Sequence, residues 1–455
     1  MVKTKASYRC SGCQYTVAKW VGRCPECGAW GSVEEATALT AVAGATIAGF
    51  LPSTPARPIT AVDSATTKAK PTGVAELDRV LGGGVVAGSV ILLAGEPGVG
   101  KSTLVLEVVH RWARRSPQDT ALYVTGEESA GQVRMRADRT GAVHDGVYLA
   151  AESDLATVIG HVQQVRPTLL VVDSVQTMCA ADTDGVIGGV TQVRAVTAAL
   201  TSLAKTTGTA VLLIGHVTKD GAVAGPRTLE HLVDVVLQFE GDRHSTLRMV
   251  RGVKNRFGAA DEVGCFELHD DGIAEVSDPS DLFLHHRTHP VPGTAVTVAM
   301  DGKRALLGEV QALVTGSSIP APRRAVSGLD FNRVAMVLAV LQSRCGVTVY
   351  NQEVYAATVG GMRVVEPAAD LAVAVAIASA ARTEVLPVGV VALGEVGLAG
   401  EVRRVSGIGR RLSEAARLGF TRALVPPNHG PLPSGIAVMP VATVADALNY
   451  LVTIR

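Results

Sequence analysis

Short apolar runs alternate with amphipathic helical patterns through the middle of the chain. From about Pro71 onward, runs of five to seven mostly apolar residues are separated by segments in which apolar residues recur with helical spacing. Such β-rich runs joined by helices are typical of a largely parallel sheet that helices cover on both faces. We therefore predict an α/β domain over residues 71–277. Its predicted strands read SVILLAG, ALYVTG, GVYLAA, TLLVVDS, AVLLIGH, DVVLQFE and TLRMV.

A second pattern begins near Asp278 and continues to Arg455. Its predicted strands read TAVTVAM, LGEVQALV, VGVVALGE and RALVPP, and its helical segments are rich in Ala and Val. This mixture predicts an α+β domain over residues 278–455. Residues 34–70 contain mainly Ala, Thr, Pro and Gly with few periodic apolar positions, so we predict a linker there.

Composition and charge narrow the class of protein. A chain of 455 residues that is 47% hydrophobic can bury more than one core. Its formal net charge is zero, so any binding of a polyanion must depend on local patches. No long, strongly apolar run and no apolar leader is evident, so we expect a cytoplasmic protein without a membrane partner. Seven cysteines in such a chain favour metal binding or free thiols over a disulfide framework.

Four of the cysteines form two C-x-x-C pairs near the N-terminus, separated by ten residues. This spacing predicts a tetrahedral Zn²⁺ site within a domain over residues 1–33. A redox dithiol is the alternative, but a single pair would suffice for that chemistry. The predicted role is docking or DNA contact, with Trp20 and Trp30 either stacking on bases or packing the small core. The predicted zinc ligands are Cys10, Cys13, Cys24 and Cys27.

The segment GEPGVGKST lies between an apolar strand and a helical pattern, which is the context of a P-loop. Its glycines allow backbone N–H groups to surround phosphates at a helix N-terminus. Lys101 adds a positive charge, and the Ser102 hydroxyl can bind Mg²⁺. The segment therefore predicts an ATP site. The predicted ATP-binding residues are Gly95, Glu96, Pro97, Gly98, Val99, Gly100, Lys101, Ser102 and Thr103.

Carboxylates that follow two other strands complete the predicted site. Asp173 ends the strand TLLVVDS, where it either helps to hold Mg²⁺ or caps a helix. Glu127 and Glu128 follow the strand ALYVTG, where a carboxylate can orient the attacking water. We favour Glu127 and keep Glu128 as a competitor. Both glutamates could instead favour the dipole at the start of the next helix.

The order of P-loop, GEES, VVDSVQT and GHVTKDG resembles the RecA-like ATPase core. Together with the four cysteines and the motif KNRFG, it resembles the bacterial RadA (Sms) family over nearly the whole chain. The family implies a DNA-dependent ATPase of recombination and DNA repair that uses ATP, Mg²⁺ and Zn²⁺. It also implies binding of single-stranded and branched DNA, and branch migration with RecA by a homo-hexameric ring helicase.

The resemblance assigns further residues to the ATP and DNA sites. His216, at the end of AVLLIGH, corresponds to a sensor of the γ-phosphate, although by itself it reads as a strand-end histidine. The loops after Asp173 and after His216 correspond to loops that face DNA. Their candidate DNA contacts are Arg194, Lys219 and Arg227, and the alternative is that both are ordinary solvated loops.

The motif KNRFG comprises Lys254, Asn255, Arg256, Phe257 and Gly258 after the alternating run TLRMVRGV. Two cations one residue apart on a strand can point the same way. RecA and the DnaB-type helicases carry such a pair near this point, and the resemblance implies that Lys254 and Arg256 reach the γ-phosphate of the next subunit. Asn255 would then fix the turn. The alternative is a turn that contacts DNA.

The end of the chain, most clearly residues 352–455, resembles the catalytic domain of Lon proteases. The nucleophilic serine of that family corresponds to Ala368, and its lysine to Gly409. Because neither a nucleophile nor a base remains, the resemblance implies a proteolytically inactive domain. We expect this domain to support ring assembly. A basic track for DNA is a further expectation, formed by Arg403, Arg404, Arg410 and Arg411.

Three functions remain open at this point. The first is a ring-forming motor that couples ATP hydrolysis to movement on DNA. The second is an adaptor in which ATP switches a platform that binds DNA or RecA. The third is a Lon-like ATP-dependent protease, which Ala368 and Gly409 disfavour.

Overall fold

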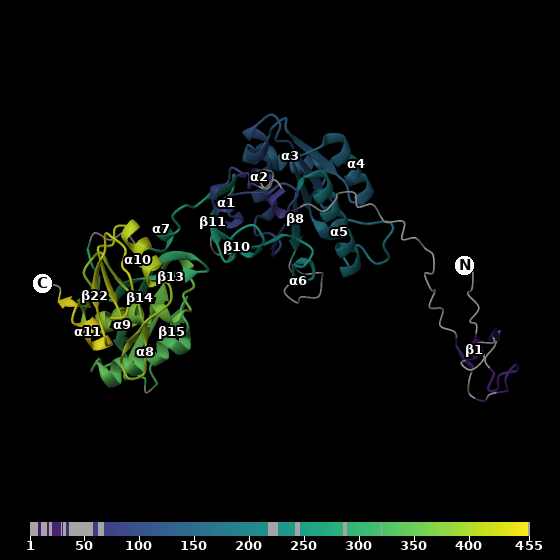
Figure 1. Cartoon of the computed structure of the whole chain (residues 1–455). Coiled ribbons are helices and arrows are strands. Elements are labelled where there is room, and N and C mark those ends of the chain that lie inside the picture. Colours follow the sequence, from purple (N-terminus) through teal and green to yellow (C-terminus); the bar gives the residue numbers. More distant parts are fainter. Residues whose placement is uncertain are drawn as a thin grey trace. The chain divides into compact units, whose positions relative to one another are not determined.

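The computed structural model describes residues 8–10, 16–17, 21–28, 30, 33–35, 58–61, 68–216, 226–241, 246–284, 289–319 and 321–453. The chain divides into two units, Met1–Ser64 and Ala65–Arg455. The second unit contains two large sheets, one in each of the two predicted α/β and α+β regions (Figure 1).

The first unit contains a small antiparallel sheet with the strand order β2-β1-β3. Its strands are β1 (Tyr8–Cys10), β2 (Thr16–Val17) and β3 (Val33–Glu35). The buried side chains of Cys10, Cys24 and Val33 pack together with the partly buried Val17. A core of this size is too small to stabilise a fold without a metal ion or a disulfide.

The larger sheet of the second unit has the strand order β12-β11-β10-β9-β4-β8-β7-β5-β6. Strands β4 to β9 are parallel, whereas β10, β11 and β12 are antiparallel. The prediction of a largely parallel sheet is confirmed, and the antiparallel edge follows from short connections that leave no room for a crossover helix. The strands are β4 (Val90–Gly95), β5 (Ala121–Thr125), β6 (Val147–Ala151), β7 (Leu169–Asp173), β8 (Ala210–His216), β9 (Val235–Gly241), β10 (Leu247–Asn255), β11 (Val263–His269) and β12 (Gly272–Glu275).

Helices cover both faces of this sheet. Alternate residues of β4 enter different cores: Ile91 and Leu93 pack with α1, α2 and α3, whereas Val90 and Leu92 pack with α4 and α5. Burial on both faces explains why these strands read as continuous apolar runs. The helices are α1 (Ala75–Leu81), α2 (Lys101–Arg115), α3 (Ala130–Thr140), α4 (Leu155–Val165), α5 (Val190–Thr207) and α6 (Pro226–Leu229), with the 3₁₀ turns η1 (Ile59–Ala61) and η3 (Val175–Thr177).

The second large sheet is mixed and has the strand order β15-β16-β14-β13-β18-β21-β22. Its strands are β13 (Thr294–Asp301), β14 (Arg304–Gly316), β15 (Arg324–Ser327), β16 (Gln352–Thr358), β18 (Val390–Ala392), β21 (Arg422–Val425) and β22 (Ala437–Pro440). Two-stranded pairs join β17 (Glu384–Val385) to β23 (Val452–Thr453) and β19 (Glu395–Val396) to β20 (Val402–Arg403).

The helix α9 (Asp370–Arg382) lies in the core of this region. Every residue from Asp370 to Ser379 is buried, which accounts for its Ala- and Val-rich sequence because a helix that is apolar all round must be enclosed. The remaining helical segments are α7 (Ser280–Phe283), α8 (Phe331–Arg344), α10 (Ile408–Arg417), α11 (Val444–Leu448), η4 (Val359–Gly361) and η5 (Pro367–Ala369).

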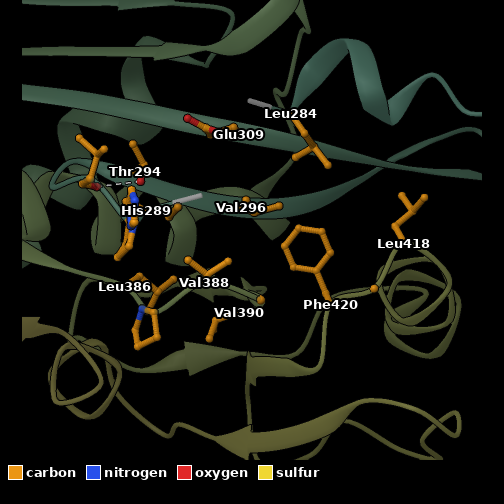
Figure 2. A pocket seen from close by; sticks show the side chains of 16 residues that line it. Leu284, His289, Thr294, Val296, Glu309, Leu386, Val388, Val390, Leu418 and Phe420 are labelled. Atoms are coloured by element: carbon orange, nitrogen blue, oxygen red, sulfur yellow. Dashed lines mark hydrogen bonds between the residues drawn. The ribbon is translucent and has the colours of Figure 1, made fainter. Parts of the chain in front are cut away.

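A cavity of about 290 Å³ opens beside β13 and β18. Figure 2 shows the apolar side chains of Val296, Val388, Leu418 and Phe420 around it, with the carboxylate of Glu309 at its edge. Glu309 is buried and accepts a hydrogen bond from Gln311 at 2.8 Å.

Within the described ranges, no helix is both long enough and apolar enough to cross a membrane.

Candidate functional site

The P-loop joins β4, which ends at Gly95, to α2, which begins at Lys101. Gly98 and Gly100 have φ angles of 79° and 106°, so both occupy the left-handed region that favours glycine. The Lys101 ammonium donates hydrogen bonds to the carbonyl oxygens of Gly95 at 2.9 Å and Glu96 at 2.8 Å. The loop therefore has the strand, nest and helix arrangement that binds phosphates.

The P-loop and an acidic cluster line one cavity of about 520 Å³. This volume lies within the range of small-molecule and cofactor sites. Burial lowers the pKa of Lys101, while the charges of Asp173 and Glu127 oppose that shift. The residues of the P-loop that line the cavity are Pro97, Gly98, Gly100, Lys101, Ser102 and Thr103.

Asp173 is the last residue of β7 and is almost fully buried. The Tyr123 hydroxyl donates a hydrogen bond to Asp173 Oδ2 at 2.5 Å. Burial, together with the charge of Asp173, raises the pKa of Tyr123 well above its usual value, so the phenol remains a donor. Asp173 Oδ1 is buried and has no hydrogen-bond partner among the described residues. A buried carboxylate oxygen of this kind fits a Mg²⁺ ion or a water molecule bound to it.

Glu127 and Glu128 have different partners although they are adjacent. Glu127 Oε1 accepts a hydrogen bond from the Ser174 hydroxyl at 2.6 Å and lies 3.0 Å from His216 Nε2. Glu128 Oε1 instead pairs with Arg136 Nη2 at 2.5 Å. Within the described site, only Glu127 lies beside both Ser174 and His216. Its role in orienting the water stays a prediction.

His216 ends β8 and joins the acidic cluster. Glu127, Asp173 and His216 offer possible ligand atoms that all lie within 4.8 Å of one another. Gln176 in η3 donates a hydrogen bond to the His216 carbonyl oxygen at 3.3 Å. Sequence reasoning missed Ser174 and Gln176, although both belong to the VVDSVQT segment that follows Asp173. Both residues lie within three residues of Asp173, and this closeness to a predicted site residue could have identified them.

The loop after Asp173 is hydrogen-bonded to the first turn of α5. Gln192 Oε1 accepts a hydrogen bond from the Ala180 N–H at 2.9 Å, and Gln192 Nε2 donates one to the Ala180 carbonyl oxygen at 3.2 Å. The tip exposes Val186 and Ile187. Arg194 is exposed on α5.

The other two candidate DNA contacts lie at the second loop. Lys219 is outside the described residues, and Arg227 is described only by its place in α6. Their roles, like that of Arg194, stay predictions.

The KNRFG motif contacts other parts of its own chain. Lys254 Nζ donates to the carbonyl oxygens of Glu230 at 2.5 Å and Val233 at 3.0 Å. Arg256 Nη1 lies 3.1 Å from Asp234 Oδ1. The cations therefore bind the segment between α6 and β9. Their predicted reach into a neighbouring subunit stays a prediction.

Asn255 and Gly258 account for the turn of the motif. Asn255 Oδ1 accepts a hydrogen bond from the Phe257 N–H at 2.9 Å, while its Nδ2 donates to the carbonyl oxygen of Leu81 at 3.1 Å. A Cβ at Gly258 would lie 3.2 Å from the Cα of Gly82. The turn is thus packed against the end of α1, and the glycine permits this close approach.

Three of the predicted zinc ligands lie together. The sulfur atoms of Cys10, Cys24 and Cys27 lie within 4.8 Å of one another, and those of Cys10 and Cys27 are 3.7 Å apart. Thiolates bound to tetrahedral zinc at about 2.3 Å are separated by about 3.8 Å, so the arrangement fits the ion. Cys13 lies outside the described residues. Trp30 is 77% exposed, with the Arg23 guanidinium 5.9 Å from its ring centre, and so does not pack a core.

An ion pair between a buried arginine and a partly buried glutamate lies next to the positions that correspond to the Lon serine and lysine. Ala368 is buried in η5, and the preceding Glu366 pairs with Arg411 through two bonds of 2.6 and 2.7 Å. The Arg411 side chain is 0% exposed, so the expectation that it belongs to an exposed basic track is wrong. Arg403, Arg404 and Arg410 are exposed.

Comparisons with known proteins agree with this layout. A profile for the AAA domain matches residues 55–222, and one for a rubredoxin metal binding domain matches residues 8–35. The DNA repair protein RadA of Mycolicibacterium smegmatis is 61% identical over 456 residues, covering 99% of this chain and 97% of its own. The protein of the same name from Mycobacterium tuberculosis H37Rv is 59% identical, with coverage of 100% and 95%. That of Streptococcus pyogenes serotype M1 is 46% identical, with coverage of 99% and 99%.

Proposed function

Because this chain belongs to the RadA family of DNA repair proteins and carries an AAA domain, we propose that it is a DNA-dependent ATPase of recombination and repair. It binds single-stranded and branched DNA and acts with RecA on recombination intermediates. It promotes their branch migration as a homo-hexameric ring helicase. The support for ATP hydrolysis lies in the site itself, while the DNA and RecA roles extend the family assignment.

The observation that carries the proposal is the position of Glu127. Its Oε1 lies 2.6 Å from Ser174 Oγ and 3.0 Å from His216 Nε2, in the cavity that the P-loop lines. A carboxylate held in this way can accept a proton from a water molecule that attacks the γ-phosphate. Catalysis of phosphoryl transfer depends on positioning and charge stabilisation, which this arrangement supplies.

The remaining groups bind and orient the nucleotide. Backbone N–H groups of the P-loop and the Lys101 ammonium hold the phosphates. Ser102 and Asp173 are the residues that would hold Mg²⁺, which when bound offsets the negative charge on the phosphates. His216 hydrogen-bonds Glu127, which is the proposed general base. A nucleotide that draws His216 toward its γ-phosphate therefore also changes the hydrogen bonding of Glu127.

The link to DNA follows the chain beyond Asp173. The Gln176 side chain donates a hydrogen bond to the His216 carbonyl oxygen. The backbone carbonyl oxygen of Gln176 lies close to Gly188 in the following loop, since a Cβ added to Gly188 would be 3.2 Å from it. A shift of His216 therefore acts on the loop that carries Val186 and Ile187. We assign this loop to contact with DNA.

The test compares ATP turnover with and without single-stranded DNA for the wild type and for Glu127→Gln. DNA should stimulate turnover by the wild type, and the variant should lose turnover by about 10²-fold or more because the base is absent. Turnover that DNA does not change would contradict the proposal.

An adaptor that ATP switches is the second candidate, since the hydrogen bonds from Glu127 through His216 to Gln176 can transmit nucleotide binding without movement along DNA. Unwinding of a branched DNA substrate with ATP or with a non-hydrolysable analogue separates the two. A motor needs hydrolysis, whereas an adaptor works with the analogue. The Lon-like protease is disfavoured by Ala368 and by the Glu366–Arg411 pair beside it.

A further inference from the structure

Arg136 is a cation within the acidic nucleotide cavity that the motifs do not account for. It lies on α3, lines the cavity together with Lys101 and Asp173, and has a side chain that is 20% exposed. Its Nη2 lies 2.5 Å from Glu128 Oε1. Its Nη1 is buried and has no hydrogen-bond partner among the described residues.

The start of α3 directs Arg136 back to Glu128. Ser129 caps the helix, and its side chain and that of Gln132 form a reciprocal capping box. Side chains on a helix lean toward its N-terminus, so Arg136, two turns into α3, covers the residues just before the cap. The capping box therefore fixes the start of α3 next to Glu128 and places Arg136 within reach of that carboxylate.

The backbone holds the two glutamates in a single turn. The N–H groups of Glu127 and Glu128 both lie within hydrogen-bond distance of Thr125 Oγ1, at 3.3 and 3.0 Å. Two carboxylates so close together could each approach the water or the Mg²⁺ ion. Their separation therefore depends on side-chain partners, which are Ser174 and His216 for one and Arg136 for the other.

We propose that Arg136 is a positioning residue that holds Glu128 away from the attacking water and the metal, so that Glu127 acts alone. This inference rests on the proposed role of Glu127. An ion pair with a guanidinium supplies the direction and strength that this separation requires. Release of Glu128 adds a free carboxylate to a site that already contains Glu127 and Asp173.

The test is a double-mutant cycle on ATP turnover with Arg136→Gln, Glu128→Gln and both together. Arg136→Gln should lower kcat by about tenfold to a hundredfold, because misplacement by about 1 Å can cost about 10²-fold. KM for ATP should change by less than about threefold, since the contact does not bind the ground state. In the double variant, kcat should return to within about threefold of Glu128→Gln alone, because no free carboxylate is released.

Arg134→Gln is the matched control. Arg134 lies on the same helix, pairs with Asp138 at 3.0 Å and is 61% exposed, so its replacement should leave turnover unchanged. Should Arg136→Gln fail to fold, the same cycle is run with Arg136→Lys, which keeps the charge. The expected result is then a smaller loss of kcat that Glu128→Gln again removes.

Three outcomes would overturn the proposal. The first is normal kcat in Arg136→Gln. The second is a double variant no better than Arg136→Gln, which is the result of a purely structural role. The third is loss of turnover in Glu128→Gln with retention in Glu127→Gln, which makes Glu128 the base. Failure of the Glu127 assignment appears as turnover retained in Glu127→Gln, which distinguishes it from the first two outcomes.

Discussion

Glu366 and Arg411 form a two-point ion pair in the C-terminal domain, in which the Arg411 side chain is buried and that of Glu366 is partly exposed. Oε1 lies 2.6 Å from Nη1 and Oε2 lies 2.7 Å from Nη2. Glu366 also accepts a hydrogen bond from the Met300 N–H at 2.7 Å, and Arg411 donates one to the Val298 carbonyl at 2.6 Å. The pair therefore ties η5 and α10 to β13, beside the position where a Lon protease would carry its nucleophile.

We predict that Arg411→Ala destabilises the protein by about 3 kcal/mol, the lower end for breaking a buried ion pair, because Arg411 is 0% exposed whereas the Glu366 carboxylate that loses its partner is 26% exposed. Urea denaturation followed by circular dichroism measures the change. Arg403→Ala is the control, since Arg403 is 59% exposed and its pair with Glu401 should contribute less than about 1 kcal/mol. Equal losses of unfolding free energy in the two variants would contradict this prediction, because the pair of Arg411 would then contribute no more than an exposed pair.

The burial of Arg411 illustrates what the sequence could and could not predict. The segment VRRVSGIGRR reads as a charged surface, because the partner that buries Arg411 lies 45 residues earlier in the chain. The hydrogen bond between Tyr123 and Asp173, which are 50 residues apart, was missed for the same reason. Such contacts depend on the packing of separate elements.

Local patterns predicted more. The P-loop glycines, the strand that precedes them and Asp173 at a strand end are each specified within a few residues. β4 and Asp173 lie in the sheet as expected, and Gly98 and Gly100 lie in the loop between β4 and α2. Helical or strand periodicity depends only on near neighbours, so the α/β architecture could be predicted from it. The antiparallel edge formed by β10, β11 and β12 required knowledge of strand pairing.

We predict that Lys101→Ala abolishes ATP turnover. The ammonium is buried at the P-loop, and its loss removes the positive charge that stabilises the phosphates in the transition state. Turnover is measured by phosphate release with and without single-stranded DNA. Arg134→Ala is a suitable control, because that arginine is 61% exposed and pairs with Asp138 outside the cavity. Near-normal hydrolysis by Lys101→Ala would contradict the P-loop assignment.

The N-terminal cysteines predict a metal dependence that is confined to one unit. Cys24→Ala, or treatment with a chelator, should release one Zn²⁺ per chain and unfold residues near the N-terminus, because metal binding supplies most of the folding energy of such a module. ATP turnover without DNA should be retained, since the ATPase site lies in the unit Ala65–Arg455. Metal analysis, DNA binding and basal turnover are measured together. Purified wild-type protein without zinc would refute the site.

The KNRFG motif predicts that catalysis and DNA binding respond differently to one substitution. The hydrogen bonds described for the Lys254 side chain go to the backbone carbonyl oxygens of Glu230 and Val233. None of these hydrogen bonds joins Lys254 to a charged group. A cation that reaches the γ-phosphate of a neighbouring subunit can contribute about 10³- to 10⁵-fold to turnover. One exposed cation on DNA contributes far less to affinity.

We therefore expect Lys254→Ala to lower DNA-stimulated turnover by at least about 10²-fold, with less than about a threefold change in DNA affinity. Mixing the variant with wild-type chains adds a second measurement. If Lys254 acts on the next subunit, a turnover-dead Glu127→Gln chain should supply its intact Lys254 to the ATP site of a Lys254→Ala chain, so mixed oligomers should regain turnover. A larger effect on DNA affinity than on turnover, without recovery on mixing, would instead identify the motif as a turn that contacts DNA.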